Sequence, residues 1–206
     1  MKPNEKRKIL VAVTGASGSI YAERLITELC KYVPRIYLVV TESGESVIQY
    51  ELTKGKKELS LISLIRGNIP AAYAGIIKVF KNNDFFAPIA SGSSAATDMV
   101  VTPCSMGTLA RIRHGLSQNL IDRAADVVMK EGKNLILCPR ESPFNTIHLE
   151  NMLALSRIGV KIVPLMPAFY QKPKDLNEAI DFLVGKMLEQ LGIEHDLYKP
   201  WDERRS

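Results

Sequence analysis

Short apolar runs alternate along the chain with stretches in which apolar residues recur every three or four positions. The runs occupy residues 9–13, 36–40, 99–102, 135–138 and 162–165. Uninterrupted runs of this kind are typical of strands that are buried on both faces of a parallel sheet. We therefore predict a strand at each run.

Helical spacing is clearest over residues 21–29 and 121–128. In the second stretch the alanines and branched residues recur on one face, which we expect to pack on the core. Asp122 and the other charged residues of this stretch are expected to face solvent. Gly132 follows at the position where a helix commonly ends.

Two further helices are predicted from their starting residues. Ser142-Pro143 is suited to the N-cap and first turn of a helix that reaches Leu153, and Asp175 to the N-cap of one that reaches Leu191. No element is predicted over residues 54–88. Strands that alternate with helices in this way predict right-handed βαβ crossovers, and hence an α/β fold with a doubly wound parallel sheet.

Composition supports one globular domain. Hydrophobic residues make up 46% of the 206-residue chain and charged residues 24%, an ordinary balance for a packed core. We expect a single domain over residues 1–206, with an irregular tail over 193–206. The charged start lacks the apolar stretch of a signal peptide, and no apolar run is long enough to cross a bilayer. The expectation is a cytoplasmic protein without a membrane partner.

Charge and cysteine spacing narrow the ligand classes. The net charge is +5, but the basic residues are scattered, a pattern that favours small anionic ligands and gives no reason to expect nucleic acid as a partner. Cys30, Cys104 and Cys138 form no CxxC pair and are expected to be reduced thiols in the core. The histidines are far apart and lack ligand spacing, so no metal site is expected.

The segment after the first run, Thr14-Gly15-Ala16-Ser17-Gly18-Ser19, has the composition of a strand–loop–helix turn that holds a phosphate. Gly15 and Gly18 let a ligand approach the backbone, the following helix N-terminus offers N–H groups, and the hydroxyls add donors. A plain tight turn would also use these glycines. The loop is not a Walker A motif, because no Gly-Lys-Ser/Thr follows.

A nicotinamide-dependent dehydrogenase is one alternative for this loop. Its fingerprint needs a third glycine where Ser19 or Tyr21 stands. Tyr170 and Lys174 have the Tyr-x-x-x-Lys spacing of short-chain dehydrogenases, but Pro173 interrupts the helical turn that this spacing requires. Flavin mononucleotide (FMN), with a single terminal phosphate, fits a two-glycine, hydroxyl-rich loop better.

Polar turns also follow the later strands, at the edge where open α/β sheets bind ligands. Together with the first loop they provide six motifs in one order: Thr-Gly-Ala-Ser-Gly at 14–18, Pro-Cys-Ser-Met at 103–106, Arg-Ala-Ala-Asp-Val at 123–127, Arg-Glu-Ser-Pro at 140–143, Ile-His-Leu-Glu-Asn-Met at 147–152 and Pro-Ala-Phe-Tyr at 167–170. In this set the chain resembles the UbiX/Pad-type flavin prenyltransferases over nearly its whole length.

The resemblance implies a flavodoxin-like (Rossmann-like) flavoprotein, assembled as a homo-oligomer, usually a dodecamer. It also implies an enzyme that transfers a dimethylallyl group from dimethylallyl phosphate to N5 and C6 of reduced FMN. The product, prenylated FMN, would serve a UbiD-type decarboxylase. By carry-over, the residues that bind FMN are Gly15, Ala16, Ser17, Thr41, Ser105, Met106, Gly107, Thr108 and Arg140.

The same carry-over assigns the rest of the site. The residues expected at the prenyl phosphate are Lys130, Arg140, Tyr170 and Lys186, with Arg123 nearby and some of them supplied by a neighbouring subunit. Fixed cations of this kind stabilise a departing phosphate without a metal. Glu141, Glu51 and Ser17 are the candidate catalytic residues, with the two carboxyl groups as acid/base groups. Trp201 is expected either to help close the pocket or to anchor the tail.

The chain departs from the family pattern at three of these positions. Gly107 stands where many members have lysine, Ser142 replaces the usual threonine, and Lys186 replaces an arginine found in some relatives. Two other functions remain open. A flavin-dependent cysteine decarboxylase of the same fold has Pro-Ala-Ser-Ala-Asn-Thr in place of residues 103–108, and a noncatalytic FMN-binding subunit would not need Lys130, Glu141 or Tyr170.

Overall fold

The fold is built on a six-stranded sheet, described here from a computed structural model over residues 7–53 and 60–199. All neighbouring strands pair in parallel, in the order β3-β2-β1-β4-β5-β6. Their bounds are β1 Lys8–Val13, β2 Arg35–Val40, β3 Ile77–Lys81, β4 Asp98–Cys104, β5 Asn134–Pro139 and β6 Lys161–Ile162. The predicted doubly wound parallel sheet is confirmed.

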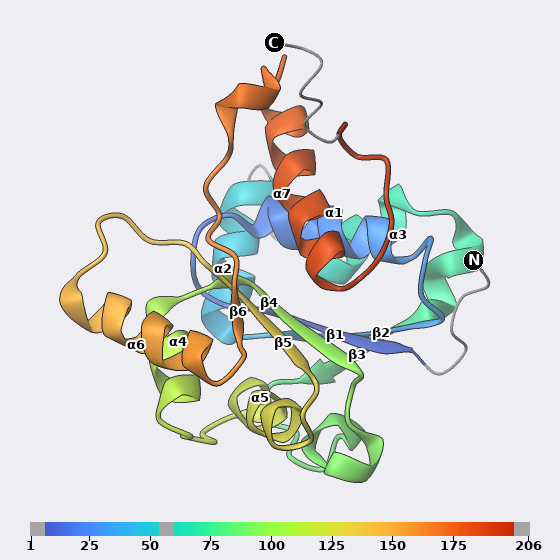
Figure 1. The fold of residues 1–206 in the computed structure, drawn as a ribbon. Coiled ribbons are helices and arrows are strands. Elements are labelled where there is room, and N and C mark those ends of the chain that lie inside the picture. The colour runs from blue at the N-terminus through green and yellow to red at the C-terminus, as the bar shows by residue number, and fades with distance from the viewer. Residues whose placement is uncertain (1–6, 54–59, 200–206) are drawn as a thin grey trace.

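Helices cover both faces of the sheet (Figure 1). One face carries α1 (Ser19–Leu29), α2 (Glu42–Leu52), α3 (Leu61–Asn68) and α7 (Leu176–Gln190). The opposite face carries α4 (Met106–Arg113), α5 (Leu120–Lys130) and α6 (Thr146–Arg157). Short 3-10 segments lie between these elements, at Ala71–Ile76, Pro88–Ala90, Gly92–Ser94 and Phe169–Gln171.

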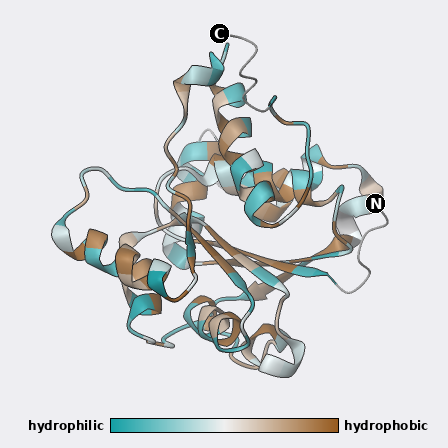
Figure 2. Cartoon of the chain, in the orientation of Figure 1, coloured by the Kyte–Doolittle hydropathy of each residue, from teal (hydrophilic) through white to brown (hydrophobic). Residues whose placement is uncertain are grey.

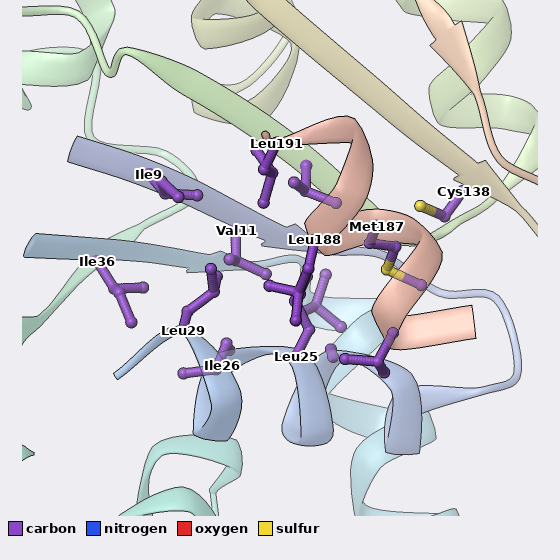
Figure 3. Packing of buried hydrophobic residues seen from close by; sticks show 14 of the residues in the cluster. Ile9, Val11, Leu25, Ile26, Leu29, Ile36, Cys138, Met187, Leu188 and Leu191 are labelled. Atoms are coloured by element: carbon purple, nitrogen blue, oxygen red, sulfur yellow. The ribbon is translucent and has the colours of Figure 1, made fainter. Parts of the chain in front are cut away.

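Each face of the sheet has its own apolar core. On the first, Leu25 and Leu29 of α1 pack with Leu188 of α7 over Ile9 and Val11 of β1 (Figure 3). The second is built around the buried residues of β4, β5 and α5. Figure 2 shows largely apolar strands between helices that carry both hydrophobic and hydrophilic residues. Because helices enclose the inner strands from both sides, side chains on both faces of each strand are buried. This burial explains the continuous apolar runs in the sequence.

Two strands differ from the sequence-based expectation. β3 lies inside the stretch for which no element was predicted. It is an edge strand in which only Ile77 and Phe80 are buried, so it lacks the continuous apolar run that marks the inner strands. β6 ends at Ile162 rather than at 165; Pro164, which has no N–H for a ladder, follows soon after.

Helix starts were predicted with mixed success. The Asp175 carboxylate accepts the Glu178 amide at 3.0 Å and begins α7, as expected. The predicted Ser142-Pro143 start is wrong: α6 begins at Thr146, with Asn145 as its cap in a capping box with His148. An asparagine whose side chain reaches the third helical N–H is the stronger cap.

Asp122 is a second correction, because it does not face solvent. Its side chain is fully buried and bonds Arg111 of α4. Gly132, by contrast, follows the end of α5 with φ of 64°, in the left-handed region that suits glycine there.

The three cysteines are buried and unpaired, as predicted. Burial raises the pKa of the Cys30 thiol to about 11 and that of Cys138 to about 12. Within residues 7–53 and 60–199, His, Cys, Asp and Glu side chains form no group of three or more that could hold a metal ion. Over the same ranges, no helix is long and apolar enough to cross a membrane.

Candidate functional site

Most of the residues predicted to bind FMN lie in the segments that directly follow β1 and β4, which pair side by side at the middle of the sheet. Chain connections diverge from this point to either side, and at such a point open α/β sheets form a ligand-binding crevice outside the carboxyl ends of the strands. Thr14 spans the crevice floor: its buried hydroxyl donates to the Pro103 carbonyl at 2.8 Å and accepts from the Ser105 amide at 2.8 Å. The loops after β1 and β4 are thus locked together.

Gly15 lies against the start of α2. A Cβ built at Gly15 would lie 2.5 Å from Ser43 Oγ and 2.7 Å from Ser43 Cβ, closer than atoms of real side chains approach. Thr41, the predicted FMN residue after β2, caps α2 by accepting the Gly44 amide at 3.0 Å. Glycine is therefore required here for close packing, and it brings the Gly15 backbone and the Thr41 and Ser43 hydroxyls to one place.

Glu51 occupies the N-terminus of α1, which corrects part of the expectation for the first loop. Its carboxylate accepts the amides of Gly18, at 3.0 and 3.1 Å, and Ser19, at 2.9 Å. Burial raises the pKa of Glu51, but hydrogen bonds from the Ser17 hydroxyl and from these amides outweigh it, so the pKa lies below its ordinary value. The α1 amides thus already hold an anion, and a phosphate needs another helix N-terminus.

The N-terminus of α4 offers one. Ser105 is its N-cap and accepts the Thr108 amide at 3.3 Å. The amides of Met106 and Gly107 belong to the first turn, where N–H groups have no intrahelical partner. Met106 and Thr108 are buried and Gly107 is exposed. Helix dipole and donors together make this turn the better anion cradle of the two.

Arg140 and Glu141 follow β5 on the other side of β4, and both are exposed. The Arg140 amide donates to the Cys104 carbonyl at 3.3 Å, which fixes the start of this turn beside the end of β4. Among the described residues, the Glu141 carboxylate accepts only its neighbouring amide, Ser142 N, at 2.9 Å. The Arg140 guanidinium has no hydrogen bond or ion pair within the described part of the chain, as suits a residue that receives an anion.

Tyr170 and Lys186 come close to each other through Phe182. The Tyr170 ring packs edge-on to Phe182 with centroids 5.7 Å apart, and Lys186 Nζ lies 5.5 Å from the same ring. Lys186 also lies 5.0 Å from the Tyr198 ring and bonds Glu189 at 2.9 Å. Burial lowers the pKa of Lys186, but the hydrogen bonds and charges of Tyr198 and Glu189 together raise it by more. The pKa of Lys186 therefore lies above its ordinary value.

Tyr198 was missed by the sequence-based reasoning. It packs across Gly185, where a Cβ would lie 2.5 Å from the Tyr198 ring, and its hydroxyl donates to Glu189. The one signal in the sequence was an aromatic residue in the tail near Trp201. Trp201 itself lies outside the described residues.

Lys130 and Arg123 are not brought to the crevice. Lys130 ends α5 just before β5 begins, at the opposite edge of the sheet, and pairs with Glu131 at 2.8 Å. Arg123 donates to the Ala90 carbonyl at 3.1 Å and pairs with Asp126 at 2.9 Å. Within one chain, no described contact joins either side chain to Arg140, Tyr170 or Lys186.

Comparison with known proteins identifies relatives over nearly the whole chain. The family model "Flavoprotein" matches residues 1–193. A flavin prenyltransferase UbiX of Halalkalibacterium halodurans is 47% identical over 95% of this chain and 93% of its own.

Two solved structures share the fold at high similarity. A dodecameric FMN-dependent UbiX-like decarboxylase from Escherichia coli O157:H7 matches with a TM-score of 0.83 and 40% identity, over 95% of this chain and 99% of its own. AnUbiX (PadA1), in complex with FMN and dimethylallyl pyrophosphate, matches with a TM-score of 0.83 and 37% identity, over 95% and 97% of the two chains.

Proposed function

This chain belongs to the flavoprotein family, among its UbiX flavin prenyltransferases, and we propose that it transfers a dimethylallyl group from dimethylallyl phosphate to N5 and C6 of reduced FMN. One observation carries the proposal: in a chain of this family, the motif residues after β1, β2, β4 and β5 converge on one crevice. The products are prenylated FMN and inorganic phosphate. When bound, FMN supplies the nucleophilic ring atoms.

The residues around the crevice fit FMN. The Gly15 backbone packs directly against Ser43, and we assign one side of the flavin to this loop, at Gly15, Ala16 and Ser17. We assign the FMN phosphate to the α4 N-terminus, with the amides of Met106 and Gly107. The remaining contacts come from hydroxyl groups at the surrounding turns and one guanidinium, those of Thr41, Ser105, Thr108 and Arg140.

Cations around the prenyl phosphate provide the driving force for its departure. We assign Arg140, Lys186 and Tyr170 to the prenyl phosphate, and Lys186 stays charged because its pKa is raised. As the allylic C–O bond breaks, negative charge grows on the phosphate, and preset cations stabilise it more than they stabilise the bound substrate. Tyr170 donates a further hydrogen bond.

Two carboxyl groups are available to move protons. Bonds at N5 and C6 would release two protons, of which one would add to the prenyl double bond as the C6 bond forms and the other would go to the phosphate. Glu51 is ionised and accepts the Ser17 hydroxyl, so the pair can take a proton from a ligand at Ser17 and pass it to the carboxylate. Glu141 is exposed beside Arg140 and lies on the phosphate side. We assign proton removal to Ser17 with Glu51, and proton exchange with the phosphate to Glu141.

Lys130 and Arg123 can contribute only from a second copy of the chain, because α5 places Lys130 at the far edge of its own sheet. We propose a homo-oligomer in which α5 of one copy lies over the crevice of the next, and a dodecamer as its full form, as in the relative from E. coli O157:H7. On α6 the exposed side chains of Ile147, Leu149 and Leu153 support assembly, since free apolar faces mark contact sites.

The proposal extends to the domain organisation, the location and the partner of the protein. The chain is one domain over residues 1–206, it works in the cytoplasm, and a UbiD-type decarboxylase receives the prenylated FMN.

Co-expression of two inactive variants tests the shared site. Lys130→Met and Arg140→Met should each abolish phosphate release from dimethylallyl phosphate with reduced FMN. Mixed oligomers purified through two different tags should regain activity, because some interfaces pair an intact Lys130 with an intact Arg140. Mixed oligomers as inactive as the separate variants would place both residues in one chain's site and refute the arrangement.

A further inference from the structure

A buried carboxylate on α5 holds an arginine of α4 in place. Asp122, with a fully buried side chain, accepts Arg111 Nε at 2.8 Å and Asn119 Nδ2 at 2.9 Å. Burial raises the pKa of Asp122, and the Arg111 hydrogen bond and charge oppose that rise. A carboxylate this deeply buried needs its cationic partner, so Arg111 is fixed in orientation by its Nε side.

From there Arg111 extends toward the start of its own helix. Side chains on a helix lean toward its N-terminus, and Arg111 Nη2 donates to Thr108 Oγ1 at 3.0 Å. Ser105 Oγ donates to the same Thr108 oxygen at 3.1 Å. A continuous series of bonds thus runs from Asp122 through Arg111 and Thr108 to the N-cap, Ser105.

The third guanidinium nitrogen of Arg111, Nη1, remains available to bind a ligand. Arg111 Nη1 has no hydrogen-bond partner among residues 7–53 and 60–199, and it lies 3.8 Å from the position that a Cβ on Gly107 would occupy. Apart from its chain neighbours and the backbone of its own helix, no other described residue comes within 4 Å of that position. Because residue 107 is a glycine, no side chain separates Nη1 from the first-turn amides of α4.

We propose that Arg111 binds the FMN phosphate through Nη1, across the open space left by Gly107. This inference rests on the proposed placement of FMN at the α4 N-terminus. The guanidinium adds a full positive charge to the partial charge of the helix end, and a charge-assisted bond to phosphate is among the stronger contacts available to a protein. Asp122 is a positioning residue, since it holds Arg111 without reaching the ligand, whereas the Thr108 hydroxyl holds Arg111 Nη2 and also belongs to the proposed FMN contacts.

Comparing FMN with riboflavin, which lacks the phosphate, tests this assignment. Removing Arg111 alone would leave Asp122 buried without a partner, so the test variant is Arg111→Met with Asp122→Asn. In this double variant we expect FMN to bind about ten- to a hundredfold more weakly, with riboflavin affinity within about twofold of the wild type. Arg113→Met on the same helix should keep the wild-type ratio of FMN to riboflavin affinity. Asp122→Asn alone, whose amide oxygen can still accept Arg111 Nε, should change that ratio less than the double variant does.

Adding Gly107→Lys to the double variant should restore FMN affinity, because the lysine has room and returns a cation to the same turn. Fluorescence titration of oxidised flavins gives these constants without any turnover. A folded double variant with the wild-type FMN-to-riboflavin ratio would overturn the role of Arg111. That result would leave prenyl transfer untouched, because transfer is measured separately by the mass of the flavin product.

Discussion

Replacing Glu51 by glutamine tests whether an internal carboxylate stabilises the first loop. The wild-type carboxylate accepts the Gly18 and Ser19 amides at 2.9–3.1 Å. Glutamine keeps an accepting oxygen but loses the negative charge. Hydrogen bonds to a charged group exceed neutral ones by roughly 1 kcal/mol, and the helix end adds a few tenths to 1 kcal/mol. Because Glu51 is partly exposed, solvent screening reduces both contributions.

We therefore expect Glu51→Gln to lower the free energy of unfolding by about 1–2 kcal/mol at pH 7, and the melting temperature by about 2–8 °C. The pKa of Glu51 is lower in the folded state than in the unfolded chain. Its stabilisation is thus complete above the unfolded pKa and disappears as pH falls through the folded pKa. Urea unfolding at pH 7 and at successively lower pH measures the difference between the two proteins.

Glu45→Gln is the matched control on the same helix. Burial raises the pKa of Glu45, and its carboxylate has no bonding partner in the described part of the chain, so its charge costs stability at pH 7. This variant should be as stable as the wild type or slightly more stable. If Glu51→Gln unfolds at the wild-type urea concentration, or if its deficit persists unchanged in acid, the charge of Glu51 does not stabilise the loop.

Three further predictions follow from contacts around the crevice and core. Gly15→Ala should lower the free energy of unfolding by about 1–3 kcal/mol, because the new Cβ overpacks against Ser43. Adding Ser43→Gly to this variant should recover most of the loss in thermal melts, and no recovery would mean that another contact is responsible. Cys104 and Cys138, both fully buried with raised pKa, should react with a thiol reagent only at the rate of unfolding, and fast labelling of the native protein would contradict their burial. Lys186→Met should raise KM for dimethylallyl phosphate at least tenfold while Lys186→Arg keeps it near wild type, and equal KM values for both would remove Lys186 from the phosphate site.

Sequence patterns were sufficient for the inner sheet and for the turns that carry the site. The four inner strands, β1, β2, β4 and β5, are buried on both faces, and their sequences are therefore continuous apolar runs. The turns at their carboxyl ends follow from parallel pairing alone. The edge strand β3 was not predicted, because a half-exposed strand lacks a continuous apolar run.

Contacts between residues that are distant in the sequence could not be predicted from these sequence patterns. Asp122 has the helical spacing of a solvent-facing residue, and only the approach of Arg111 from α4 makes its burial tolerable. Glu51 was found through a family resemblance, whereas its bonds to the Gly18 and Ser19 amides depend on how α2 packs beside α1. Lys130 shows the reverse case: the family resemblance implies a place at the prenyl phosphate, but the fold puts Lys130 away from its expected neighbours.

The mass of the flavin recovered from the protein tests prenyl transfer most directly. Purified protein is incubated without oxygen with reduced FMN and dimethylallyl phosphate, the flavin is released, and its mass spectrum is compared with a sample lacking the prenyl donor. We predict a flavin heavier by one C5H8 unit, formed in equal amount with inorganic phosphate. FMN of unchanged mass, from protein that binds FMN and is exposed to intact donor, would contradict the proposed activity.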